Sequence, residues 1–162
     1  MAVLVAGPRP ALPDGSADPA AVKNEDGKYF DKSGTPTFNI APDGTVDWYT
    51  YSGYRRLNSE CEVCHGPDGE GSSFAPSLVD ALKTMSYTDF ETVVVNGRKD
   101  VNTASDRVMP SFGTNRNVMC YLDDIFVYLR ALSDGKLGRN EPAKHADKPP
   151  AAAQAETDCM GF

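Results

Sequence analysis

Residues 59–71, SECEVCHGPDGEG, place two cysteines three positions apart, with a histidine directly after the second cysteine. Two common kinds of site fit this pattern poorly. A redox-active dithiol belongs in a βαβ setting, which this sequence lacks, and it does not need the histidine. A structural zinc site needs four ligands. The other histidine, His145, lies in a polar tail, and the other cysteines, Cys120 and Cys159, are isolated.

Covalent haem attachment uses every part of the motif. The thiols of Cys61 and Cys64 can add to the two vinyl groups on one haem edge, and the imidazole of His65 then reaches the iron. The sequence therefore predicts one haem c, bound through Cys61 and Cys64 and ligated by His65.

A six-coordinate iron needs a second axial ligand, and the favoured residue is Met109. It lies in the loop SDRVMPSFG, far enough along the chain to cross to the opposite haem face, and Pro110 stiffens that loop. Thioether ligation suits electron transfer. The remaining candidates are expected to be packing or surface residues: Met85, Met119, Met160 and His145.

Composition limits the function class. The chain has 162 residues, 40% of them hydrophobic, and 16 basic against 23 acidic side chains give a net charge of −7. This balance argues against nucleic-acid binding, and no apolar run is long enough to span a membrane. The start, MAVLVAGPRPALPDG, lacks a basic n-region. It is expected to be a mature N-terminus behind an added Met, with the signal peptide already removed.

Three regions are expected along the chain: an extended arm at residues 1–35, a compact domain at 36–138, and a Pro/Ala-rich tail at 139–162. The domain is predicted to be all-α, with helices over 52–65, 86–97 and 114–135 and a short β-hairpin around residues 42–44. Ser86 or Thr88 can cap the second helix, and Gly97 can end it. About 80 residues with long loops form a marginal core, so a bound haem would complete it.

Together, the CxxCH motif, the Ala75-Pro76 pair, the Met-Pro loop and the aromatic last helix resemble a class I c-type cytochrome. The resemblance implies that the Pro76 carbonyl accepts the second ring proton of His65 and so orients it. It also implies a crossing of the first and last helices at Gly53 and Tyr128.

The strings at 45–78, 94–113 and 117–135 are similar to the cytochrome c-L group. Members of that group accept electrons from quinoprotein (PQQ-dependent) methanol dehydrogenases in the bacterial periplasm, and the similarity is greatest to those paired with lanthanide-dependent enzymes. The resemblance implies a one-electron carrier that is not an enzyme and passes its electrons to a further cytochrome c or an oxidase. We expect the carrier to be a monomer. A class I cytochrome c with another donor, and a small haem peroxidase or gas-binding protein, remain alternatives. The last two would need an open iron position.

Further expectations concern the surroundings of the haem. In an oxidising periplasm Cys120 and Cys159 are expected to form a disulfide that pins the tail. Arg98, Arg107, Trp48 and Tyr49 are candidates for contacts with the haem propionates, although both arginines could equally be solvated surface residues. The loop KDVNTASD offers oxygen ligands for a calcium ion, as in some cytochrome c-L members. An exposed haem edge ringed by Val63, Phe74 or Phe112 would be the docking patch.

Overall fold

Helices α1 (Trp48–Glu60) and α6 (Leu122–Ser133) make the largest contact between elements. The structure is a computed structural model that describes residues 20–102 and 105–162. Gly53 lies where the two helices cross. A Cβ at this position would lie 1.9 Å from the backbone oxygen of Asp124 and 2.8 Å from Cβ of Tyr128. Only glycine allows this approach, and the glycine–aromatic crossing agrees with the cytochrome resemblance.

The first helix begins earlier than residue 52 and is broken before residue 65. Asp47 caps it by accepting a hydrogen bond from the backbone N–H of Thr50 at 2.9 Å, so Trp48 and Tyr49 are helical rather than part of a hairpin. The helix ends at Glu60, and the four-residue helix α2 (Glu62–His65) follows Cys61. The break turns the cysteine motif away from the axis of α1.

Helix α4 (Tyr87–Asn96) forms as predicted, capped by Ser86, whose hydroxyl accepts from the N–H of Asp89 at 3.1 Å, and ended by Gly97. The last predicted helix is divided into α5 (Arg116–Met119) and α6. Short helices η1 (Pro67–Gly69) and α3 (Leu78–Ala81) follow the motif. The core between these helices is apolar: Leu57, Leu82, Phe90, Val94, Val118, Leu122, Ile125, Phe126, Val127, Tyr128, Leu129 and Leu132.

The prediction of an extended arm over residues 1–35 is wrong for its described part. Strands β1 (Lys23–Glu25), β2 (Lys28–Phe30) and β3 (Pro36–Thr37) form an antiparallel sheet in sequence order. Asp26 and Gly27, at φ 49° and 88°, form the tight turn that joins β1 to β2. Residues 1–19 lie outside the described residues. The hairpin expected around residues 42–44 is reduced to a single bridge between Ile40 and Val46.

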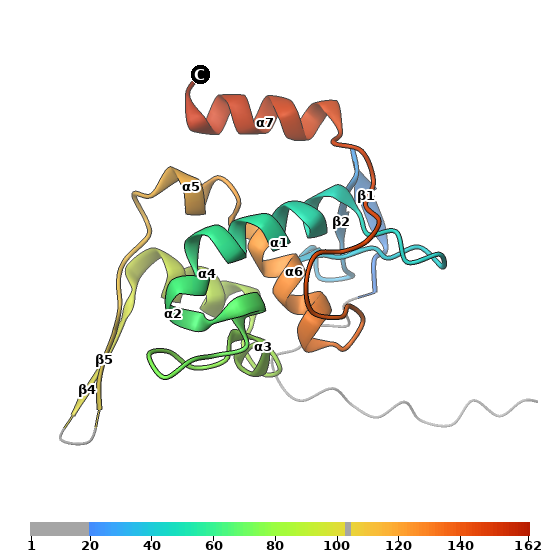
Figure 1. Ribbon diagram of the computed structural model, residues 1–162. Helices are drawn as coiled ribbons and strands as arrows, with labels where there is room; N and C mark the ends of the chain where they lie inside the picture. The colour runs from blue at the N-terminus through green and yellow to red at the C-terminus, as the bar shows by residue number, and fades with distance from the viewer. Residues whose placement is uncertain (1–19, 103–104) are drawn as a thin grey trace, which may run out of the picture.

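The segment that carries Met109 is also a hairpin rather than a loop. Strands β4 (Arg98–Asn102) and β5 (Ser105–Met109) pair antiparallel, with Arg98 opposite Met109. Figure 1 shows this ribbon projecting from the body of the molecule, on the side away from β1 and β2. The domain is therefore mostly helical but not all-α.

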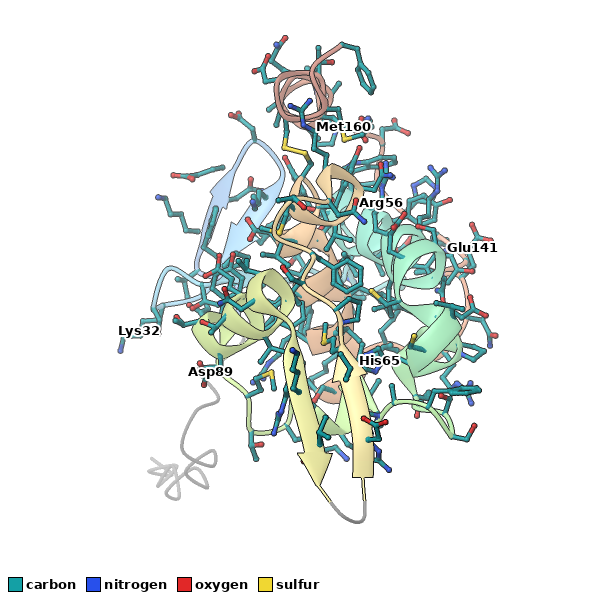
Figure 2. All side chains as sticks on the ribbon, turned by 90° about the vertical axis from the view of Figure 1, so that its left-hand side faces the viewer. Lys32, Arg56, His65, Asp89, Glu141 and Met160 are labelled. Carbon is teal, nitrogen blue, oxygen red and sulfur yellow. A yellow bond between two sulfur atoms is a disulfide. The ribbon has the colours of Figure 1, made fainter. Side chains whose placement is uncertain are left out.

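The Pro/Ala-rich tail contains helix α7 (Pro150–Met160), which lies beside α5 at one end of the molecule (Figure 1). Its alanine-rich sequence favours a helix, and Pro150 is tolerated in the first turn. The segment before α7 is held against Val46 by two backbone hydrogen bonds. The N–H of Val46 donates to the carbonyl of Lys144 at 3.1 Å, and the N–H of Ala146 donates to the carbonyl of Val46 at 2.9 Å. The predicted disulfide between Cys120 and Cys159 is confirmed, with the Cα atoms 5.7 Å apart; it joins α7 to the body (Figure 2). No helix among the described residues has the length and apolar character to cross a membrane.

Candidate cofactor site

An apolar cavity of about 260 Å³ opens beside α2. One wall carries Cys61, Cys64 and His65, and the rest is almost entirely apolar: Val63, Leu78, Ala81, Leu82, Met85, Phe90, Val93, Val94, Met109, Pro110, Phe112, Val118, Leu122, Ile125 and Leu129, with Glu60 at the edge. An apolar lining with two thiols and one imidazole on a single wall has the chemistry that a covalently attached porphyrin requires. The residues therefore fit a haem.

The two motif cysteines are free of any disulfide; Cys64 is exposed and Cys61 is half-buried. Burial raises the pKa of the Cys61 thiol to about 11, and the nearby Glu60 carboxylate adds to this shift. Helix α2 fixes the spacing of the motif, because the N–H of His65 donates to the carbonyl of Cys61 at 2.9 Å. Both cysteine side chains thus border the cavity.

His65 is buried, and its Nδ1 lies 2.8 Å from the carbonyl oxygen of Pro76. Because a carbonyl can only accept, Nδ1 must carry the proton, which leaves the lone pair on Nε2. This is the contact that the resemblance implied for Pro76. Figure 2 shows His65 at the base of the β4–β5 ribbon, near the end that carries Met109.

Two methionines, Met109 and Met85, line the cavity. Met109 enters from the end of β5, where Gly97 packs closely: a Cβ there would lie 2.5 Å from the Met109 carbonyl oxygen. Met85 was expected only as a packing or surface residue, and its place at the cavity was missed. The apolar spacing of Leu78, Leu82 and Met85 along α3 and the turn after it was the signal that could have found it.

The other candidate ligands lie elsewhere. Met119 lines a second cavity. The Met160 carbonyl, at the end of α7, accepts from Arg116 at 2.8 Å. The His145 ring stacks on Tyr51, with the ring centroids 3.7 Å apart.

Arg98 and Arg107 line a small cleft of about 190 Å³ together with Phe74 and Pro76, and Met109 borders both this cleft and the main cavity. Trp48 and Tyr49 are not brought to the site. They line the second cavity, of about 420 Å³, between α1, α6 and α7. The reason is the length of α1: these residues begin the helix and Cys61 follows its end, roughly 18 Å away along the axis.

The loop KDVNTASD, expected to offer calcium ligands, is only partly described by the structure. Residues 103–104 lie outside the described residues. Across residues 20–102 and 105–162, no group of three or more His, Cys, Asp or Glu side chains is arranged to hold a metal ion.

Comparison with known proteins agrees with this site. No protein-family model matches the chain. A crystal structure of the c-type cytochrome XoxG from Methylobacterium extorquens AM1 superposes with a TM-score of 0.80 at 47% identity, covering 93% of this chain and 99% of that one. Cytochrome c-555 of Methylococcus capsulatus is 37% identical over 105 residues, 64% of this chain and 76% of that protein. The chain belongs to the c-type cytochromes.

Cytochrome c-553I of Paracoccus denitrificans is 51% identical to this cytochrome over 136 residues, 84% of this chain. The match spans 60% of the length of the Paracoccus protein. Membership of the family implies covalently bound haem c, in agreement with the cysteine motif and the cavity beside it.

Proposed function

We propose that this cytochrome is a periplasmic carrier that takes single electrons from a PQQ-dependent methanol or other alcohol dehydrogenase and passes them to a further cytochrome c or an oxidase. The observation that carries the electron-transfer role is the shared cavity. Cys61, Cys64 and His65 lie on one wall of it, and Met109 enters from another element.

Each residue has a defined task in this proposal. Cys61 and Cys64 hold the haem through thioether bonds, and His65, oriented by the Pro76 carbonyl, ligates the iron. Met109 would be the second protein ligand of the iron. A bound haem would supply one-electron redox chemistry, and ligation by both His65 and Met109 would leave no open position for a peroxidase or a gas-binding protein.

Arg98 and Arg107 line a cleft that adjoins the cofactor cavity at Met109. Both are exposed and share a cleft with Pro76 and Met109. A guanidinium and a carboxylate form strong charge-assisted hydrogen bonds. The propionate role is therefore proposed for these two arginines and withdrawn for Trp48 and Tyr49.

The proposed donor rests on the resemblance of three sequence strings to the cytochrome c-L group. The docking patch is assigned to Val63 and Phe74, whose side chains are 84% and 76% exposed. Val63 also borders the cavity, so a partner bound there would lie close to the haem. Phe112 is half-buried and packs on the core, which removes it from the patch.

The test is stopped-flow reduction of the ferric protein by a purified quinoprotein methanol dehydrogenase with methanol, compared with an unrelated cytochrome c. Fast, saturable reduction that the unrelated cytochrome cannot match is expected. Val63→Lys should slow reduction by the dehydrogenase and leave reduction by ascorbate unchanged. Val22→Lys, at another exposed valine (66%), is the matched control. Reduction of the wild type no faster than that of the unrelated cytochrome would remove the dehydrogenase as donor.

A further inference from the structure

Asp68, three residues after His65, is a buried carboxylate close to the haem-binding motif. It lies in η1 with a left-handed backbone (φ 57°, ψ 15°), and only 3% of the residue is exposed. Burying a carboxylate is costly unless hydrogen bonds compensate for the lost water. The buried carboxylate of Asp68 therefore needs hydrogen-bond partners, and a charge kept at this cost indicates a function.

Partners from three segments meet at this carboxylate. Oδ1 accepts from the Tyr128 hydroxyl of α6 at 2.9 Å and from the Asn58 amide of α1 at 3.3 Å. Oδ2 accepts from the backbone N–H of Asn140 at 2.9 Å. The N–H of Asp68 itself donates to Asn58 Oδ1 at 3.0 Å. Asp68 thus holds the loop after His65 against α1, α6 and the start of the tail.

These partners solvate the charge of Asp68 without neutralising it. Among the described residues the carboxylate is paired with Arg139, whose Nε lies 3.8 Å from Oδ2 and whose side chain is 57% exposed. Arg139 is shared with Glu70, at 3.9 Å. Two carboxylates therefore face one exposed guanidinium, and the net negative charge lies partly in the protein interior.

A buried charge acts over a longer distance than an exposed one, because the interior screens it less than water does. A fixed negative charge stabilises the more positive, ferric state of a neighbouring iron centre. We propose that Asp68 is a positioning residue for the haem site: it anchors the loop that follows His65, and its charge lowers the reduction potential of the haem ligated by His65. This inference rests on the haem site of the proposed function.

The test is a spectroelectrochemical titration of the haem-loaded protein. Asp68→Asn should have a higher reduction potential than the wild type while its ferric and ferrous spectra stay low-spin. Glu70→Gln, which removes a neighbouring carboxylate that is 38% exposed, is the matched control and should shift the potential less. An Asp68→Asn potential at or below the wild-type value, or no higher than that of Glu70→Gln, would overturn the proposal.

Tyr128→Phe distinguishes an effect of the Asp68 charge on the potential from an effect of a loosened loop. This variant removes a hydrogen-bond donor to Asp68 but keeps the carboxylate and the ring, so the potential should fall or stay the same. A rise like that of Asp68→Asn would mean that both variants act by loosening the loop, and the charge role would be wrong.

A second pair of variants tests the proposal even when Asp68→Asn does not fold. Arg139→Gln removes the cation that is paired with the carboxylate and should lower the potential. Lys144→Gln removes a similarly exposed cation (59%) that is paired with Asp43 instead, and should change it less. Equal shifts in the two variants would contradict the proposal. A normal wild-type haem protein that fails these tests would leave the electron-carrier function standing.

Discussion

Gly53→Ala tests the helix crossing on which the fold depends. The new Cβ would lie 1.9 Å from the Asp124 backbone oxygen, whereas ordinary contact begins at 3.4 Å, so α1 and α6 would have to separate locally by about 1.5 Å. Overpacking of this kind costs about 3 kcal/mol or more, and the better helix propensity of alanine offsets about 1 kcal/mol of it. We expect a net loss of at least about 2 kcal/mol in the free energy of unfolding.

Urea unfolding of the haem-loaded protein, followed by far-ultraviolet circular dichroism, measures this loss. Gly138→Ala is the matched control, because nothing lies within 4 Å of the position that its new methyl group would take, and its φ is not positive. That variant should stay within about 0.5 kcal/mol of the wild type. A Gly53→Ala protein as stable as Gly138→Ala would refute the account of the crossing.

Two further predictions concern the tail and a buried acid. Replacing Cys120 and Cys159 by serine opens a loop with a sequence separation of 39. The free energy of unfolding should fall by up to about 4 kcal/mol, and the backbone amides of α7 should exchange their hydrogens faster. Unchanged exchange would show that other contacts hold the helix. Burial raises the pKa of Asp124 from 3.8 to about 7, against the opposing hydrogen bond from Ser52. The folded state therefore binds more protons between these values, and wild-type stability should fall as pH rises from about 4 to 7, by up to about 4 kcal/mol. Asp124→Asn should lack this slope in urea titrations at several pH values, and an identical slope in both proteins would contradict the assignment.

Features encoded by local spacing could be predicted from the sequence. The CxxCH motif and the cap and end of α4 each depend on a few residues at fixed distances along the chain, whereas the Gly53–Tyr128 crossing was expected only from the resemblance to class I cytochromes. The Cys120–Cys159 pair was also identified, because an oxidising compartment leaves two isolated cysteines with few other roles.

The errors have physical reasons as well. Asp26-Gly27 is a strong turn signal, but the strands on either side are only three residues long and gain stability from a third, β3. Helix α7 has little apolar character of its own, and the disulfide holds it in place. Trp48 and Tyr49 were candidates for propionate contacts because a buried Trp or Tyr needs a hydrogen-bond partner, but the Asp47 cap begins α1 at Trp48 and places both residues at the second cavity. Met85 lines the cavity through the packing of α3 and the turn after it, and the apolar spacing of Leu78, Leu82 and Met85 that indicates this place was not recognised.

The ferric absorption spectrum of haem-loaded methionine variants tests the central claim most directly, because Met85 and Met109 both line the cavity. We predict a low-spin wild type, a high-spin Met109→Ala protein and a Met85→Ala protein that remains low-spin. A low-spin Met109→Ala protein, or a high-spin Met85→Ala protein, would contradict ligation of the iron by Met109.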